Sequence, residues 1–181
     1  MHGTEAPSPW VCRWTPLIRP AAEVLDLACG GGRHMQWLAA QGHRVLGVDR
    51  SPEALALASA FGPTLQADIE SGPWPLQGRS FDAVVVTHYL WRPLWPQILA
   101  SVAAGGLLIY ETFARGHETV GRPSRPDFLL APGELLQVAT QGGLRVLAYE
   151  DGFLPAPERF VQRLVAVREQ PGDTPARWPL A

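Results

Sequence analysis

Residues 24–34 of the chain read Val24-Leu25-Asp26-Leu27-Ala28-Cys29-Gly30-Gly31-Gly32-Arg33-His34, an apolar run that ends in a carboxylate, followed by a glycine-dense turn. A second apolar run, from Val45 to Asp49, follows after about one helix length and also ends in an acid. Glycine permits backbone angles and close approaches that a Cβ would forbid, so a ligand can lie against the turn. An acid about twenty residues after such a turn is placed to accept hydrogen bonds from ribose hydroxyls. The pattern predicts a nucleotide-type pocket at the carboxyl ends of parallel strands.

Strand-like and helix-like segments alternate along the whole chain. Strands are expected at 23–28, 44–49, 64–68, 81–87, 107–111, 144–149 and 160–168, and helices at 33–41, from 52 onward, at about 93–104 and at 132–140. Residues 70–80, rich in Gly and Pro, are expected to form a loop instead of a helix. The link between the last two strands is too short for a crossover helix, so the last strand must run antiparallel to the one before it. The sequence predicts an α/β fold with a doubly wound, mostly parallel seven-stranded sheet.

Three motifs, in order, resemble those of a known enzyme family. Asp26 through Gly32, then Asp49, and then Ala67-Asp68-Ile69 resemble the glycine-rich, ribose and adenine motifs of class I S-adenosylmethionine-dependent methyltransferases. The resemblance runs from about residue 23 to about residue 168, and it implies a Rossmann-like sheet with a reversed last strand. It also implies S-adenosylmethionine as the cofactor. The cofactor-binding residues that it implies are Asp26, Ala28, Cys29, Gly30, Gly32, Asp49, Arg50, Ala67, Asp68, Ile69 and Thr87.

A nicotinamide dinucleotide fold is the alternative, because it also has a strand, a glycine turn and an acid. Its turn reads G-x-G-x-x-G, and this chain lacks the third glycine, since His34 and Met35 open the helix. Asp26 at the strand end would repel a pyrophosphate but could receive the amino group of a methionine moiety. These features favour the methyltransferase pocket over an NAD-dependent oxidoreductase. A third interpretation makes the glycines a tight strand-to-helix connection and nothing more.

Length and composition fit one domain, because 181 residues with 46% hydrophobic side chains can bury a substantial core. We expect a proline-rich lid segment at 1–22 over the first strand, a cofactor-binding domain at 23–169 and a mobile tail at 170–181. No segment is long and apolar enough to span a membrane, and the N-terminus lacks the apolar core of a signal peptide. The expected location is therefore cytoplasmic, while the oligomeric state is not predicted.

Charge and residue types exclude several kinds of chemistry. The formal net charge of −2 gives no electrostatic footprint for nucleic acid. The Asp/Asn-Pro-Pro-Tyr tetrad of amino-directed nucleic-acid methyltransferases is absent as well. The chain has no lysine for covalent catalysis, and its two cysteines lack the spacing of a metal or redox pair, so no metal is expected. Cys29 is predicted to be a small packed side chain rather than a nucleophile.

The methyl acceptor should bind in the loops that follow the fourth and fifth strands. Methyl transfer is an in-line displacement, to which the protein contributes position and desolvation. His88 titrates near neutrality at the end of the fourth strand, so it is the first candidate for a general base, with Tyr89 beside it. Trp91 is expected to line the acceptor pocket. The alternatives are that His88 shapes the cofactor pocket and that the aromatic residues belong to the core.

The segment 113–128 is too long for an ordinary connection, and loops of this length are usually functional. Its arginines Arg115, Arg122 and Arg125 suit bidentate recognition of carboxylate or phosphate, unless they are merely solvated. The surrounding sequence resembles small bacterial methyltransferases labelled with tellurite resistance, a label that implies kinship and not the acceptor. We predict transfer of a methyl group from S-adenosylmethionine to a small anionic or aromatic molecule. The alternatives are an oxidoreductase and a non-catalytic module that binds the cofactor.

Overall fold

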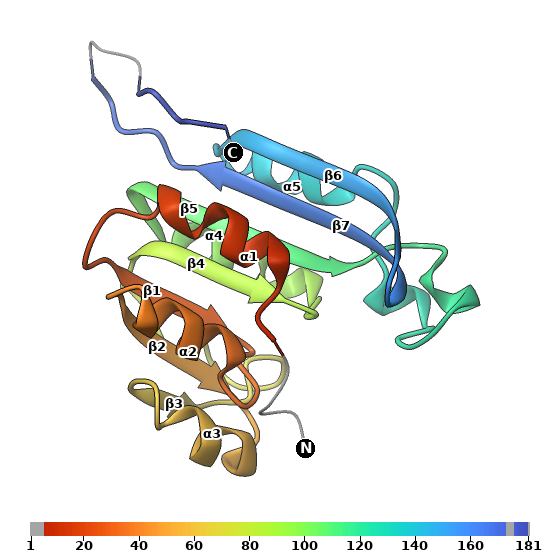
Figure 1. Cartoon of the computed structure of the whole chain (residues 1–181), viewed down its shortest axis with the longest axis horizontal. Coiled ribbons are helices and arrows are strands. Elements are labelled where there is room, and N and C mark those ends of the chain that lie inside the picture. Colours follow the sequence, from red (N-terminus) through yellow and green to blue (C-terminus); the bar gives the residue numbers. More distant parts are fainter. Residues whose placement is uncertain (1–5, 173–175, 181) are drawn as a thin grey trace.

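The centre of the molecule is a seven-stranded sheet with the order β3-β2-β1-β4-β5-β7-β6 (Figure 1). The computed structural model describes residues 6–172 and 176–180. Strands β1 to β5 are parallel where they pair, and β7 runs antiparallel to both β5 and β6. The strands are β1 (Glu23–Leu27), β2 (Arg44–Asp49), β3 (Thr64–Gln66), β4 (Phe81–Thr87), β5 (Val102–Phe113), β6 (Arg145–Pro155) and β7 (Glu158–Val167). The predicted α/β class and the antiparallel last strand are confirmed.

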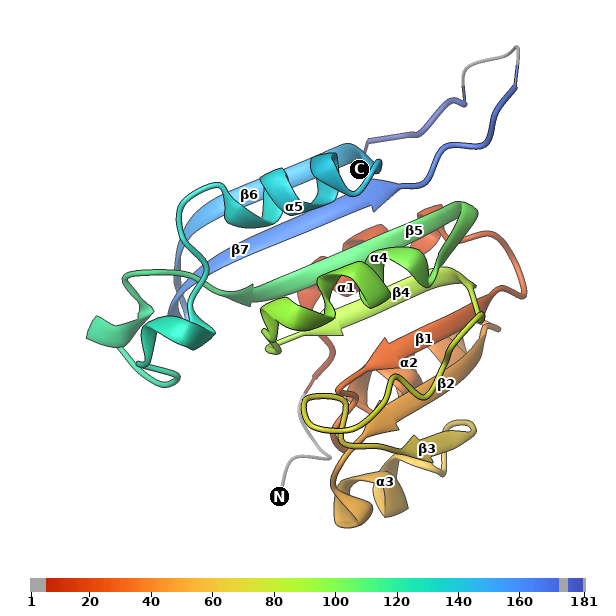
Figure 2. The same cartoon turned by 180° about the vertical axis from the view of Figure 1, so that it is seen from behind.

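Helices cover both faces of the sheet. Helices α1, α2 and α3 lie on the face seen in Figure 1, and α4 and α5 lie on the face seen in Figure 2. The helices are α1 (Pro9–Trp14), α2 (Arg33–Ala40), α3 (Pro52–Ala58), α4 (Trp95–Ala100) and α5 (Glu134–Gln141). Short 3-10 helices are η1 (Thr15–Leu17), η2 (Arg92–Leu94), η3 (His117–Thr119) and η4 (Pro126–Phe128). Helix α3 begins as predicted, because the Ser51 hydroxyl accepts a hydrogen bond from the Ala54 amide.

The core consists of two apolar layers, one on each face of the sheet. Successive side chains of a strand point to opposite faces, so Leu25 and Leu27 join one layer while Val24 joins the other. The first layer packs against α4 and α5, and the second packs against α1, α2 and α3. This double cover explains why the central strands read as nearly continuous apolar runs.

Several predicted boundaries are wrong. The helix expected at 93–104 ends at Ala100, and β5 begins at Val102 instead of residue 107. The pairing of β5 with β4 shifts register between Phe81 and Ala83, so Gly105 and Gly106 form an irregularity inside the strand instead of a break before it. Strand β6 extends to Pro155 and pairs there with Glu158, the first residue of β7, because β6 is an edge strand and an edge strand tolerates proline.

The N-terminal segment packs on the sheet through α1. Trp10 of α1 donates its indole hydrogen to the Leu164 carbonyl of β7 at 3.3 Å, and α1 also contacts β5. Residues 1–5 of the predicted lid, and residues 173–175 and 181 of the predicted tail, lie outside the described residues. Trp178 of the tail packs against the core layer that contains α1. Among the described residues, no helix is long and apolar enough to cross a membrane.

Candidate active site

A cavity of about 180 Å³ opens where the loops after β1, β2, β3 and β4 meet, and we call it cavity A. Ligands of open α/β sheets bind at this edge, outside the carboxyl ends of the strands. Its lining residues are Ala28, Asp49, Arg50, Ala67, Asp68, Ile69, Glu70 and Tyr89. Six of the residues predicted to bind the cofactor are therefore brought together here, from three different loops.

The glycine turn is tied to the end of β2. The Gly30 amide donates a 2.8 Å hydrogen bond to one Asp49 carboxylate oxygen, and the Ser51 amide donates a 2.9 Å bond to the other. Gly30 and Gly32 both have positive φ, which favours glycine. A Cβ on Gly32 would lie 2.9 Å from Ala58 of α3, whereas a Cβ on Gly30 would meet nothing within 4 Å. Gly32 thus allows α2 and α3 to approach, while Gly30 leaves open space beside the turn.

Asp68 holds the loop after β3 in a tight turn. One of its carboxylate oxygens accepts hydrogen bonds from the Glu70 amide at 3.0 Å and the Ser71 amide at 3.2 Å. These two hydrogen bonds lower the pKa of Asp68, and the bond from the Glu70 amide has the larger effect. The side chain is therefore ionised at neutral pH. Asp49 and Asp68 therefore present two carboxyl groups from adjacent strands to the same cavity.

Three other predicted cofactor residues lie below the surface of cavity A. Asp26 is 1% exposed, and burial raises its pKa to about 7 despite the opposing charge of Arg33. Its Oδ2 atom has no hydrogen-bond partner among the described residues. Cys29 is buried, and burial raises its thiol pKa, which suits the predicted packing role. Thr87 is also buried and contacts His34, so none of the three lines cavity A in the described structure.

A second cavity, cavity B, has a volume of about 560 Å³ and lies beside the N-terminal segment. Its charged and aromatic lining residues are Arg33, His88, Glu111, Phe113, His117, Arg122, Glu158 and Arg159, and the rest of the wall is made by Ala6 to Pro9, Gly121, Ala156 and Pro157. His88 lines cavity B while the next residue, Tyr89, lines cavity A. The chain turns sharply here, because His88 has a φ of 53°, which is unusual for a residue with a side chain. The loop after β4 therefore separates the two cavities.

His88 and Tyr89 have different proton affinities. Burial and the positive charges of Arg33 and Arg159 lower the pKa of His88 to about 4, so its ring is neutral at neutral pH. The ring stacks on Phe113, whose other neighbour is the ring of His117. Burial and the nearby Glu70 raise the pKa of Tyr89, so its phenol stays protonated. Of the two predicted catalytic side chains, only His88 has a lone pair available for a proton at neutral pH.

The loop arginines do not gather as predicted. Arg122 lines cavity B, but Arg115 and Arg125 line neither cavity. Arg125 is 72% exposed and pairs with Asp127 at 2.9 Å, which is typical of a solvated surface pair. Trp91 packs against the core rather than on either cavity. The long loop is held by Arg92, whose guanidinium donates to the carbonyls of Asp127 and Leu129.

Sequence reasoning missed the other charged residues of cavity B. Glu111 carried a signal, because an acid ends the apolar run that forms β5. Arg33 and His117 lie inside segments that the sequence singled out, but nothing local showed where their side chains would point. Arg159 comes from the β6–β7 hairpin, and no motif connects it with the glycine turn.

The comparisons with known proteins agree with this geometry. Residues 24–105 match the family model of a methyltransferase domain. This segment of the chain is similar to methyltransferase domains. The resemblance drawn from the three motifs is thereby confirmed. Part of the chain is also 37% identical, over 91 residues, to an uncharacterized methyltransferase from Synechocystis, covering 49% of this chain and 42% of that protein. The chain therefore spans less than half the length of this curated relative.

Solved structures extend the match from this domain to the whole methyltransferase fold. TehB from Haemophilus influenzae has a TM-score of 0.75 at 21% identity, covering 93% of this chain and 64% of that one. Magnesium protoporphyrin IX methyltransferase from Synechocystis, solved with bound SAH, has a TM-score of 0.65 at 18% identity, covering 88% of this chain and 79% of that one. At these identities the likeness shows the fold, including the reversed last strand.

Proposed function

We propose that the chain transfers a methyl group from S-adenosylmethionine to a small anionic or aromatic molecule. The observation that carries the proposal is cavity A, where carboxylates at the ends of β2 and β3 face a glycine turn. When bound, S-adenosylmethionine would supply a methyl carbon on a positively charged sulfur. The methyltransferase domain over 24–105 contains these three elements and supports the same conclusion.

The residues present fit this cofactor. A carboxylate has about four acceptor positions, and the Gly30 and Ser51 amides use two of those on Asp49. The remaining two match the two hydroxyls of a ribose. Asp68 and Ile69, on the next loop, would contact the adenine. The unpartnered Oδ2 of Asp26 would accept a hydrogen bond from the amino group of the cofactor's methionine part, bound beside the glycine turn.

Cavity B is the proposed acceptor site. It adjoins the loop that carries His88 and Tyr89, so an acceptor there would lie next to the cofactor cavity. Arg33, Arg122 and Arg159 outnumber the acids Glu111 and Glu158 in its lining, which favours an anionic molecule. The ring face of Phe113 would pack against an aromatic acceptor, but His88 and His117 already stack on that ring. The balance therefore favours the anionic class.

His88 is the proposed general base. Its neutral ring can take the proton from an acceptor O–H, S–H or N–H group while the acceptor's lone pair forms the bond to the methyl carbon. The carbon–sulfur electron pair remains on sulfur, which becomes a neutral thioether. Charge is thereby lost at sulfur and gained at His88, beside a wall to which the N-terminal segment and the β6–β7 hairpin contribute.

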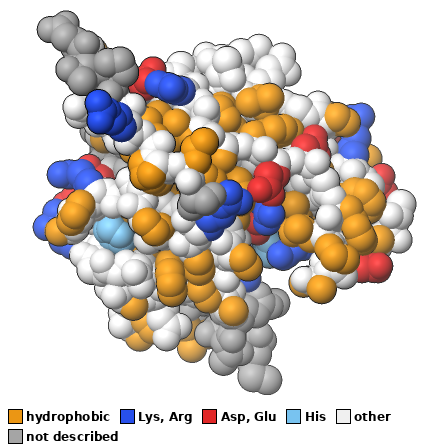
Figure 3. Space-filling model, turned by 45° about the horizontal axis from the view of Figure 1, so that its top comes forward, with side chains coloured by type: hydrophobic (Ala, Val, Ile, Leu, Met, Phe, Trp, Pro, Cys, Tyr) orange, Lys and Arg blue, Asp and Glu red, His pale blue; other side chains and the backbone are white. Residues whose placement is uncertain are grey.

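We propose no nucleic-acid partner and a cytoplasmic location. Basic side chains are dispersed over the face in Figure 3 rather than joined in one basic surface. The formal charge of −2 agrees with this, since nucleic-acid binding is favoured by clustered positive charge. Both cysteines are free thiols, as expected in a reducing compartment.

The proposal is tested by incubating the chain with S-adenosylmethionine labelled in its methyl group and a panel of small acids, each beside its neutral amide. We expect labelled product from at least one acid and less from its amide, because the arginines of cavity B would no longer pair with a charge. Product from amides alone would contradict the anionic class. Tight binding of S-adenosylhomocysteine without any product would instead favour the non-catalytic module.

A further inference from the structure

Glu111 is a carboxylate with no exposed surface, placed near the carboxyl end of β5 on the wall of cavity B. It lies opposite Arg163 in the pairing of β5 with β7, and Arg163 lies opposite Glu150 in the pairing of β7 with β6. The Arg163 guanidinium is 3.5 Å from Oε2 of Glu111 but hydrogen-bonds to Glu150. Burying a charge is unfavourable unless it is paired and hydrogen-bonded. Stabilisation of the buried Glu111 carboxylate therefore depends on its other contacts.

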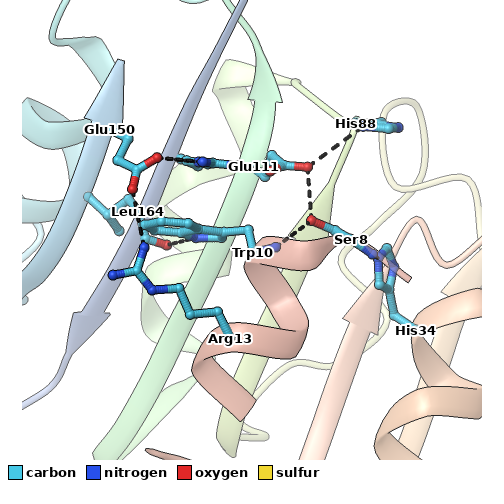
Figure 4. A network of polar contacts seen from close by, with 9 residues as sticks. Ser8, Trp10, Arg13, His34, His88, Glu111, Glu150 and Leu164 are labelled. Carbon is cyan, nitrogen blue, oxygen red and sulfur yellow. Dashed lines mark hydrogen bonds and ion pairs between the residues drawn. The ribbon is translucent and has the colours of Figure 1, made fainter. Parts of the chain in front are cut away.

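Those contacts come from the N-terminal segment, as Figure 4 shows. The Ser8 hydroxyl donates a 3.0 Å hydrogen bond to Oε1 of Glu111, and the Ser8 amide donates to Nε2 of His34 at 3.1 Å. Because Nε2 of His34 accepts, its Nδ1 carries the hydrogen and donates to the Thr87 hydroxyl at 3.3 Å. Burial lowers the pKa of His34 to about 3, so this arrangement persists at neutral pH. Ser8 thus fixes Glu111 through a buried chain that ends next to His88.

The ring of His88 lies between two charged groups. Nδ1 is 3.3 Å from a guanidinium nitrogen of Arg33, and arginine can only donate, so Nδ1 is the acceptor. The single ring hydrogen of neutral His88 is therefore on Nε2, which lies 3.9 Å from Oε1 of Glu111. Arg159 on β7 is a further positive neighbour of the ring, and His117 on η3 lines the same cavity. Glu111 is the one acid in the described structure with a carboxylate oxygen within 4 Å of a nitrogen of this ring.

We infer that Glu111 is a positioning residue for His88: its carboxylate faces the Nε2 hydrogen, while Nδ1 accepts from Arg33 until that guanidinium pairs with the anionic acceptor. The inference rests on the proposed function, because it assigns a partner to the proposed base. In the reaction Nδ1 exchanges its hydrogen bond from Arg33 for the acceptor's proton, and the imidazolium that forms keeps its Nε2 hydrogen toward the Glu111 carboxylate. A fixed negative charge at that position stabilises the positive ring as it forms. Ser8 and His34 serve to hold the carboxylate in place.

The test measures the tautomer of His88 by long-range ¹H–¹⁵N correlation spectra of the full chain at neutral pH. The His88→Gln variant identifies the His88 signals among the five histidines. We expect the parent to have the hydrogen on Nε2, and Glu111→Gln to lower the ratio of this tautomer to the other about tenfold, because the charged partner is lost. Glu150→Gln is the matched control, since Glu150 pairs with Arg163 but not with His88. Its spectrum should match that of the parent.

Three results would overturn the inference: a hydrogen on Nδ1 in the parent, an unchanged tautomer ratio in Glu111→Gln, or an equal change in Glu150→Gln. If Glu111→Gln does not fold, Ser8→Ala tests the inference in its place, because this variant keeps the Glu111 carboxylate but removes the hydroxyl that donates to it. Ser8→Ala should then broaden or shift the His88 signals, and an unchanged spectrum would overturn the inference. Calorimetric binding of S-adenosylhomocysteine by the same variants should be unchanged. Absence of binding in the parent would refute the proposed function instead, whatever the tautomer.

Discussion

Replacing Asp49 with alanine separates binding of the cofactor from stability of the fold. Two acceptor positions of the carboxylate are used by the Gly30 and Ser51 amides, at 2.8 and 2.9 Å, and two remain for a ribose. A hydrogen bond to a charged group contributes about 1.5–3 kcal/mol. Loss of even one such bond to the ribose corresponds to an affinity about 10- to 150-fold lower, because 1.4 kcal/mol is a factor of ten.

The same substitution removes two bonds within the protein. At roughly 1 kcal/mol each, their loss should lower the melting temperature by about 4–8 °C in a domain of this size, and the chain should remain folded at 25 °C. Isothermal titration with S-adenosylhomocysteine measures the affinity, and circular dichroism measures the melting temperature.

Glu53→Gln is the matched control for Asp49→Ala. Glu53 is a nearby acid that accepts a hydrogen bond from the Ser51 hydroxyl but does not line cavity A. Its variant should bind the ligand as tightly as the parent. Asp49→Ala binding within twofold of the parent would refute the ribose assignment. Equal weakening by both variants would show that local charge, and not the Asp49 contact, determines the affinity.

Gly32→Ala should melt at a lower temperature than Gly30→Ala, because only on Gly32 would the new Cβ meet the α3 backbone, at 2.9 Å; equal melting temperatures would contradict this. Arg92→Ala should increase hydrogen exchange across residues 114–131, because Arg92 donates two hydrogen bonds to carbonyls of that loop. Arg125→Gln is the control and should leave the exchange unchanged, because it breaks only an exposed ion pair. Equal exchange in the two variants would show that Arg92 does not anchor the loop. His34 is neutral in the fold because its pKa is lowered to about 3, whereas the unfolded chain takes up a proton below about pH 6.5, so stability should fall as the pH drops from about 6.5 toward 3. The contribution of His34 is at most about 1.4 kcal/mol per pH unit, and His34→Gln should reduce the slope of stability against pH; an unchanged slope would count against a buried neutral ring.

The fold and cavity A could be predicted from the sequence because their signals are local. An apolar run that ends in an acid predicts both the strand and the residue that lines the cavity, as at Asp49. The start of β5 could not be predicted in this way. Gly105 and Gly106 are typical of a break between elements, and only pairing with β4 shows that the strand continues through them.

Cavity B could be predicted only in part. His88 was found because it follows a strand, but Arg159 and Ser8 reach the same wall from opposite ends of the chain. Their positions depend on how the N-terminal segment and the β6–β7 hairpin pack on the sheet, which no local pattern records. Residues that are close in sequence can also lie apart in the fold. Arg122 lines cavity B, whereas Arg125, three residues later, forms an exposed ion pair with Asp127.

The central claim, that cavity A binds S-adenosylmethionine, is tested most directly by calorimetric titration of the chain with S-adenosylmethionine, S-adenosylhomocysteine and NADH in parallel. We predict one binding site for each of the first two ligands and none for NADH, because the glycine turn lacks the third glycine of the dinucleotide motif and lies beside the acid Asp26. At a hundred times its dissociation constant, S-adenosylhomocysteine should also stabilise the fold by about 2.7 kcal/mol. Binding of NADH but of neither sulfur ligand by the folded chain would contradict the account.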